Sequence, residues 1–312
     1  MYQHIPVMLK EAMEYLDPRP GEIIIDGTLG GGGYTFEIAK KVGTKGRVLA
    51  IDLDENAITN AKLKIEKQSI NNIVLEQANF RELAELAEKH FKIRPAGLIL
   101  DLGLSSAQIA DMSRGFSFKE DAPLSMAFGS LISDRRTEGL VNLKSLAELT
   151  SIIRDFGEEH YAYKIARSIV EQRKLEKITT TKQLVEAIAK AVPSSYKRMK
   201  IHFATRTFQA LRIATNKELE NLEVALNEAK KVLAPGARIV IVSFHSLEDR
   251  IVKQFFRQEA KDCICPPKVP VCVCHHQAWL TILTKKAVSA SREEIVANPR
   301  SRSAKLRAAK IL

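Results

Sequence analysis

Ile25-Asp26-Gly27-Thr28-Leu29-Gly30-Gly31-Gly32-Gly33-Tyr34 is the stretch that decides the fold. It follows an apolar run at residues 22–26 and precedes a helical pattern, so its glycines stand at a strand-to-helix turn. Glycine lets the backbone turn tightly and approach a ligand closely, and a helix N-terminus adds a positive end. The stretch predicts a cofactor-binding turn in an α/β domain; a tight turn without a ligand is the alternative.

Strand and helix signals alternate on both sides of this turn. Short runs rich in Ile, Val and Leu occupy residues 22–26, 47–54, 73–78 and 96–102. Helical patterns at residues 35–42, 55–68 and 80–91 lie between them. Buried parallel strands joined by helices are typical of a doubly wound sheet, which is the fold class we predict.

The alternation stops after residue 105 and resumes after residue 215. The interval contains four amphipathic helical patterns, at residues 145–156, 160–173, 181–191 and 205–213. A helix, an Ala-Pro-Gly turn, a strand at residues 238–244 and a further helix follow. We therefore expect a discontinuous α/β domain (1–105 and 216–312) and an inserted helical, substrate-recognition domain (106–215). The basic tail from Asn298 is expected to be helical or to order on binding.

The chain of 312 residues is basic, with 48 Lys and Arg against 37 Asp and Glu, a net charge of +11. Residues 194–217 and 285–312 each carry a local excess of six positive charges. Clustered positive charge indicates a polyanion such as nucleic acid, with a solvated basic face as the alternative. No apolar run approaches the ~20 residues that span a bilayer, so we expect a cytoplasmic protein without a membrane partner.

Two carboxylates follow later strand signals. Asp52 ends the second run, where a carboxylate accepts the ribose hydroxyls of an adenosine cofactor such as NAD or S-adenosylmethionine. Asp101 ends the fourth run, before Ser105 and Ser106. Because ligands of open α/β sheets bind at the carboxyl ends of strands, we expect Asp101 to face the ligand, where its carboxylate can accept protons from an amine. Capping roles are the alternative.

His245 directly follows the strand at residues 238–244 and is a candidate catalytic residue. A helix cap is the alternative, with Ser246 as N-cap and Glu248 completing it. Arg206 and Arg212 are candidates for phosphate binding. The aromatic residues expected to stack on a target base are Phe116, Phe118, Phe244 and Trp279.

All four cysteines fall within two Cys-x-Cys pairs, Cys263 with Cys265 and Cys272 with Cys274. Thiolates at close spacing hold zinc, but the usual knuckle spacing is Cys-x-x-Cys. We therefore predict no metal site and expect buried, reduced thiols. A structural metal is the alternative.

Together these motifs resemble the RsmH (MraW) family of bacterial S-adenosylmethionine-dependent methyltransferases over nearly the whole chain. The matching strings are HIPVMLKE (4–11), DGTLGGGG (26–33), AIDLD (50–54), DLGLSS (101–106), RGFSF (114–118), ATRTFQA (204–210), SFHSLEDR (243–250) and NPRSRSAKLR (298–307). The chain departs from the family pattern at Tyr34, Ser125, Ala127 and Phe203, where His, Asp, Arg and a His-Pro-Ala string are usual.

The resemblance implies a class I, Rossmann-like methyltransferase that methylates the exocyclic amine of a cytidine in small-subunit (16S) ribosomal RNA. By position, it implies cofactor contacts from Gly32, Gly33, Tyr34, Asp52, Phe80, Asp101 and Gln108, with Phe80 beside the adenine. The expected RNA contacts are Lys197, Arg198, Lys200, Arg206 and Arg212. The sequence leaves a homodimer open. A nicotinamide-dependent oxidoreductase and a non-catalytic ribosome-assembly factor are the alternative functions.

Overall fold

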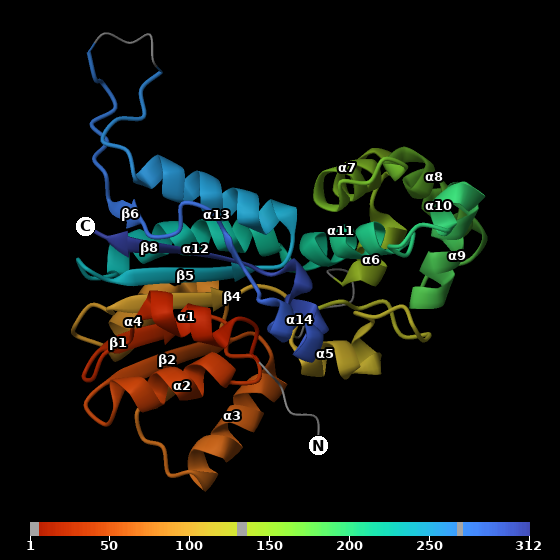
Figure 1. Cartoon of the computed structure of the whole chain (residues 1–312). Coiled ribbons are helices and arrows are strands. Elements are labelled where there is room, and N and C mark those ends of the chain that lie inside the picture. The colour runs from red at the N-terminus through yellow and green to blue at the C-terminus, as the bar shows by residue number, and fades with distance from the viewer. Residues whose placement is uncertain (1–5, 130–135, 267–270) are drawn as a thin grey trace. The chain divides into compact units, whose positions relative to one another are not determined.

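The computed structural model describes residues 6–129, 136–266 and 271–312, and it divides into two compact units (Figure 1). Unit 1 consists of Met1–Gly103 and Leu219–Leu312, and unit 2 consists of Leu104–Glu218. His4, in the first matching string, lies outside the described residues. Within the described part of the chain, no helix has the length and apolar character to cross a membrane.

The centre of unit 1 is an eight-stranded sheet in the order β3-β2-β1-β4-β5-β8-β6, with β7 paired to β8. The five strands from β3 to β5 pair in parallel, whereas β6, β7 and β8 pair antiparallel. The strands are β1 (Ile23–Asp26), β2 (Arg47–Asp52), β3 (Ile73–Gln77), β4 (Gly97–Asp101), β5 (Arg238–Ser243), β6 (Leu280–Ile282), β7 (Val288–Ser289) and β8 (Lys305–Ile311). The predicted doubly wound α/β fold is confirmed.

The basic tail forms an inner strand of the sheet, and the expectation of a helix or of ordering on binding is wrong. β8 pairs with β5 on one side and with β6 on the other. Leu306, Ala308 and Ala309 are fully buried, while Lys305 and Lys310 are exposed. This pattern fits a buried strand because the long side chains of Lys305 and Lys310, near its two ends, reach solvent while the small apolar residues between them are buried.

Helices cover both faces of this sheet, because successive side chains of a strand point to opposite faces. Ile24 packs with α1 and α2 in one core cluster, and Ile25 packs with α4, α12 and α13 in another. The helices of unit 1 are α1 (Leu9–Leu16), α2 (Gly33–Val42), α3 (Glu55–Lys67), α4 (Leu83–His90), α12 (Glu218–Val232), α13 (Ser246–Glu259) and α14 (Arg292–Ala297), with 3-10 turns η1 (Phe80–Glu82) and η4 (Pro299–Ser303).

Unit 2 is helical and has its own apolar core. Its elements are α5 (Ser106–Ala110), η2 (Met112–Arg114), α6 (Thr137–Leu143), α7 (Leu146–Gly157), α8 (Ala162–Leu175), α9 (Thr181–Ala191), α10 (Ser194–Lys197) and α11 (Thr205–Asn216). Capping boxes begin α7, where Ser145 pairs with Glu148, and α9, where Thr180 pairs with Gln183. These boxes satisfy backbone amides that lack helical partners, so the polar residues themselves fix where the helices start.

We predict that Leu184→Ala destabilises unit 2. The Leu184 side chain on α9 is fully buried in this core, and its truncation removes apolar burial and leaves a cavity, which costs about 2–5 kcal/mol. Leu175→Ala is the matched control because Leu175 is 85% exposed. Urea denaturation followed by circular dichroism should show a lower midpoint for the first variant and an almost unchanged one for the second. Equal midpoints for both variants would contradict this core.

Candidate active site

The turn between β1 and α2 is shaped by its glycines. Gly30 and Gly32 have φ values of +49° and +81°, in the left-handed region that glycine adopts without strain. Gly32 is the N-cap of α2, and a Cβ there would lie 2.5 Å from the Phe36 ring. A Cβ on Gly33 would lie 2.0 Å from Cγ of Pro6. The chain is therefore closely packed around a turn that presents backbone and no side chains.

Three carboxylates lie at one edge of the sheet. Asp26, Asp52 and Asp101 are the last residues of β1, β2 and β4. β1 pairs in parallel with β2 on one side and with β4 on the other. The carboxyl ends of all three strands therefore meet at the point where the strand order reverses, which is where open α/β sheets bind ligands.

Asp52 is held rigidly by the glycine turn. Its Oδ2 accepts a hydrogen bond from the amide of Gly30 at 2.7 Å, and its Oδ1 accepts one from the amide of Asp54 at 2.8 Å. Asp54 itself caps α3 through the amide of Asn56. Two amides thus orient the Asp52 carboxylate, and a carboxylate of fixed orientation suits the vicinal hydroxyls of a ribose.

Asp26 is fully buried beneath the turn. Its Oδ1 accepts a hydrogen bond from the Thr28 amide at 3.0 Å, and its Oδ2 accepts one from the Thr35 hydroxyl at 2.5 Å. Burial raises the pKa of Asp26 to about 6, although these hydrogen bonds oppose the shift. The carboxyl joins both ends of the turn and is not exposed to a ligand.

Oδ1 of Asp101 is buried and accepts no hydrogen bond from any described residue. Among the described residues, it is the one such carboxylate oxygen at this edge of the sheet. The backbone amide of Asp101 donates to the Thr28 hydroxyl at 2.6 Å, which ties β4 to the glycine turn. Burial, and next the charges of Asp26 and Glu248, raise the pKa of Asp101 well above its usual range. A buried acceptor without a donor is costly, so this oxygen suits a ligand that brings an N–H group.

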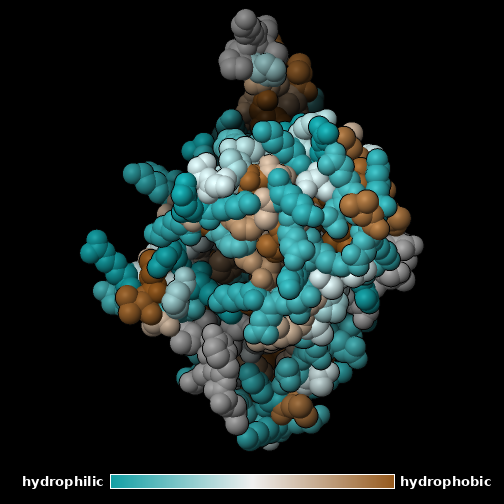
Figure 2. Space-filling view, turned by 90° about the vertical axis from the view of Figure 1, so that its right-hand side faces the viewer, coloured by the Kyte–Doolittle hydropathy of each residue, from teal (hydrophilic) through white to brown (hydrophobic). Residues whose placement is uncertain are grey.

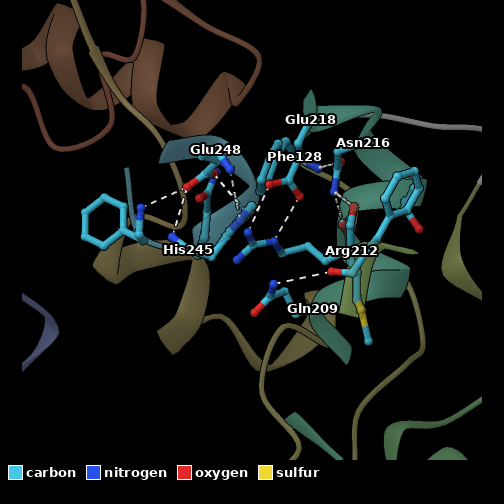
Figure 3. Close-up of polar contacts among 12 residues, drawn as sticks. Phe128, Gln209, Arg212, Asn216, Glu218, His245 and Glu248 are labelled. Atoms are coloured by element: carbon cyan, nitrogen blue, oxygen red, sulfur yellow. Dashed lines mark hydrogen bonds and ion pairs between the residues drawn. The ribbon is translucent and has the colours of Figure 1, made fainter. Parts of the chain in front are cut away.

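His245 is the N-cap of α13, and the predicted alternative with Ser246 as N-cap is wrong by one residue. Its Nδ1 accepts a hydrogen bond from the Glu248 amide, and the Glu248 carboxylate accepts one from the His245 amide (Figure 3). His245 Nε2 lies 3.1 Å from Oε1 of Glu248. The imidazole is therefore placed at the carboxyl end of β5 by its own helix cap.

The remaining predicted cofactor residues are in different settings. Tyr34 is 3% exposed and donates its hydroxyl hydrogen bond to the Val7 carbonyl. Phe80 begins η1 after β3, on unit 1, and is half-buried. Gln108 belongs to unit 2, where it completes a capping box with Ser105. The structure brings together the glycine turn, Asp52 and Asp101 at one strand edge.

The predicted RNA contacts divide into an exposed group and a paired group. Lys197, Arg198 and Lys200 are exposed at α10 and after it. Arg206 donates to the Glu158 carbonyl at 3.2 Å. Arg212 forms a two-point ion pair with Glu218, with both contacts at 2.9 Å (Figure 3). Glu218 directly follows the acid-free segment in sequence, so the segment's charge is partly neutralised by its own next residue.

A second polar cluster surrounds Asn216, and no sequence motif predicts it. Asn216 accepts a hydrogen bond from the Phe128 amide at 2.9 Å and donates one to the Met126 carbonyl at 2.8 Å (Figure 3). Arg114 donates to the Ala127 carbonyl at 3.0 Å. The family departures at positions 125 and 127 therefore lie in a segment that is held through its backbone, whichever side chains it carries.

The family model described as the MraW methylase family matches residues 1–312. The chain belongs to this family. Curated relatives named ribosomal RNA small subunit methyltransferase H include one from Thermomicrobium roseum, 47% identical over 306 residues (98% of this chain, 93% of the relative). Another, from Trichlorobacter lovleyi, is 46% identical over 311 residues (100% of this chain, 99% of the relative). The predicted family, the methyltransferase class and S-adenosylmethionine as cofactor are confirmed.

The described residues fit this cofactor. The glycine turn presents backbone at the strand edge, and two amides fix the orientation of the Asp52 carboxylate, which suits a ribose. The unpartnered Oδ1 of Asp101 requires a donor. The glycines of the turn, at positions 27 and 30–33, lack the Gly-x-Gly-x-x-Gly spacing that is typical of the pyrophosphate site of a nicotinamide cofactor.

We predict that Asp26→Asn changes how stability depends on pH. The folded pKa of about 6 lies above the ordinary 3.8, so the folded state binds more protons between these values. The contribution of Asp26 to wild-type stability therefore falls as pH rises from about 4 to about 6. The variant, which carries no charge there, should gain up to about 3 kcal/mol relative to wild type over this interval.

Urea denaturation at several pH values between these limits measures the gain. Asp262→Asn is the control, because Asp262 is exposed and its neutralisation removes no buried charge. A variant-minus-wild-type difference that is the same at every pH would show that Asp26 does not titrate in this range.

Proposed function

We propose that this protein transfers a methyl group from S-adenosylmethionine to the exocyclic amine of a cytidine in small-subunit ribosomal RNA, in the cytoplasm. The unpartnered oxygen of Asp101 beside the glycine turn carries the proposal, because it supplies an acceptor for an amine. The curated relatives, named ribosomal RNA small subunit methyltransferase H, support the RNA substrate.

The cofactor would be held by the glycine turn and by Asp52, with Phe80 as its adenine neighbour. When bound, S-adenosylmethionine supplies a methyl group activated by a sulfonium. Asp52 accepts hydroxyl hydrogen bonds while its orientation is fixed by Gly30 and Asp54. This rigid placement lowers the entropy lost when reactants are aligned.

The difficulty in the reaction lies with the nucleophile, because the cytosine amine shares its lone pair with the ring. A hydrogen bond from the amine N–H to Oδ1 of Asp101 increases the electron density on the amine nitrogen and orients its lone pair. The burial that raises the pKa of Asp101 also makes its ionised form a stronger base. Asp101 therefore holds the proton that leaves the amine, and His245, at the end of the neighbouring β5, is a candidate to orient the base.

The target cytosine has to leave its stack to reach these groups, which is least costly in RNA loops. Phe244 follows β5, and the Gly103 Cβ position lies 3.2 Å from its ring. Phe244 is therefore the candidate stacking residue on unit 1. The expectation that Trp279 stacks on the base is wrong: it precedes Leu280, whose partner Ile311 lies at the amino end of β5, at the opposite edge of the sheet from Asp101.

We predict that Asp101→Asn lowers methyl transfer by about 10²–10⁴-fold, the range for loss of a general base. Radiolabelled S-adenosylmethionine is incubated with small ribosomal subunits from a strain lacking this gene, and the nucleosides are then analysed. Wild type should label a cytidine methylated on its exocyclic amine. Exposed Asp155→Asn is the matched control and should keep the wild-type rate.

Cofactor binding, measured separately by calorimetry, shows whether the Asp101→Asn site is intact. Wild-type transfer by this variant would refute the role of Asp101. Label in another nucleoside would refute the proposed reaction. Absence of label with wild type, when the cofactor binds, would favour the non-catalytic assembly factor.

The exposed cations of unit 2 lie beside an aromatic cluster. His202 stacks on Phe118 and on Phe203, with centroid distances of 4.6 and 4.2 Å. In sequence, the cations Lys197, Arg198 and Lys200 come just before His202 and alternate with the exposed apolar residues Met199 and Ile201. Phosphate-binding cations next to flat rings are typical of surfaces that bind single-stranded RNA. Figure 2 shows that the visible molecular surface is mainly hydrophilic, with hydrophobic residues in small separate groups.

We predict that the triple variant Lys197→Ala/Arg198→Ala/Lys200→Ala weakens RNA binding and its salt dependence. Each lost phosphate contact on single-stranded RNA lowers the slope of log K against log salt by about 0.7, so the slope should fall by about 2. Lys40→Ala/Lys41→Ala/Lys45→Ala removes three exposed cations from unit 1 and is the control. Fluorescence anisotropy of a labelled ribosomal RNA fragment measures both slopes; identical slopes would exclude this surface.

A further inference from the structure

The loop between α13 and β6 contains all four cysteines of the chain and extends away from the sheet of unit 1 (Figure 1). None of the residues described between Lys261 and Trp279 is buried. Ile264, Val271 and Val273 are 40%, 71% and 68% exposed. Apolar burial therefore does not explain how this segment keeps a defined shape, and small segments without a core usually rely on a covalent or metal cross-link.

The four sulfur atoms converge within this loop. Cys263 Sγ lies 3.5 Å from Cys272 Sγ and 3.8 Å from Cys274 Sγ, and the last two are 3.6 Å apart. With Cys265 included, all four lie within 4.8 Å of one another. All four are free thiols, and Cys263 and Cys272 are exposed. The expectation of buried thiols is therefore wrong.

These separations match a tetrahedral metal site. A zinc–sulfur bond of about 2.3 Å places the corners of a tetrahedron about 3.8 Å apart. Each Cys-x-Cys pair supplies two corners, and the loop brings the two pairs face to face. The spacing that argued against zinc in the sequence is therefore compatible with it once the chain doubles back.

Backbone amides point at the same sulfur atoms. Amides of Ile264, Cys265 and Val273 donate to the sulfurs of Cys274, Cys263 and Cys265, each at 3.4 Å. Such bonds favour thiolate over thiol and orient metal ligands. They partly offset the negative charge that four thiolates would otherwise concentrate at one point.

The loop is anchored where it meets the fold. His276 Nδ1 lies 2.8 Å from the Lys261 carbonyl, and its Nε2 lies 3.6 Å from Oε2 of Glu259, at the end of α13. The amide of Trp279 donates to the Glu259 carbonyl at 2.8 Å. The cysteine cluster therefore begins from a closed base, which limits the entropy lost when an ion joins the two pairs.

We propose that Cys263, Cys265, Cys272 and Cys274 bind one structural zinc ion. The ion fixes the loop between α13 and β6 and takes no part in methyl transfer. Four protein ligands leave no open coordination position, which is the arrangement of structural and not catalytic zinc. The proposal replaces the expectation of no metal site and does not depend on the substrate.

The test begins with the full chain, purified without chelator, and measures metals by mass spectrometry. Wild type should contain about one zinc per chain, and Cys274→Ser less than about a tenth of that. His275→Asn is the matched control: position 275 has a φ of +51°, which Asn tolerates, and its side chain is outside the ligand set. It should keep its zinc.

A second measurement needs no variant, so it remains valid if Cys274→Ser fails to fold. Wild type is stripped with chelator under reducing conditions and titrated with Co²⁺, which reports tetrahedral thiolate ligation by its visible and charge-transfer absorption. Saturation at about one Co²⁺ per chain, reversed by zinc, is expected. Trypsin should also cut within residues 261–279 about ten-fold faster in the stripped protein.

Iron in place of zinc would overturn the assignment of the metal. Two disulfides in protein prepared without oxidant, or no tetrahedral cobalt spectrum from the reduced wild type, would overturn the site itself.

Discussion

Parallel pairing of β1 with both β2 and β4 is the constraint on which the proposed site depends. Parallel strands align their carboxyl ends, so residues far apart in sequence arrive at one edge without any loop having to place them. Asp26, Asp52 and Asp101 meet in this way. The glycine turn is fastened to them, because Asp52 accepts from the Gly30 amide and the Asp101 amide donates to Thr28.

The convergence of these three carboxylates is electrostatically unfavourable. Three carboxylates at one edge repel each other, and burial makes the ionised forms costlier. Different local bonding separates their roles: Asp52 receives two amides, Asp26 receives an amide and a hydroxyl, and Asp101 Oδ1 receives none among the described residues. The structure thus gives three chemically equal side chains three different environments: Asp52 is oriented by amides, Asp26 is an internal brace, and Asp101 has a buried oxygen without a donor in the described part of the chain.

Sequence predicted the parts of this protein in which local pattern and tertiary structure agree. The five parallel strands and the main helices of unit 2 have strong periodicity, and each forms where expected. The inner position of β8 could not be predicted, because alternating cations and alanines lack the apolar run typical of a buried strand. The Arg212–Glu218 pair and the sulfur cluster depend on how the chain folds back, which spacing alone does not specify. The individual roles of the predicted cofactor and RNA residues stay predictions.

The inner position of β8 has a consequence for synthesis on the ribosome. Residues 104–218 are contiguous, so all contacts within unit 2 are available once that stretch has emerged. The sheet of unit 1 instead lacks the partner of β5 until residues 305–311 have been made. Since chains generally fold in units as they emerge, the inserted unit is expected to mature before the domain that contains it.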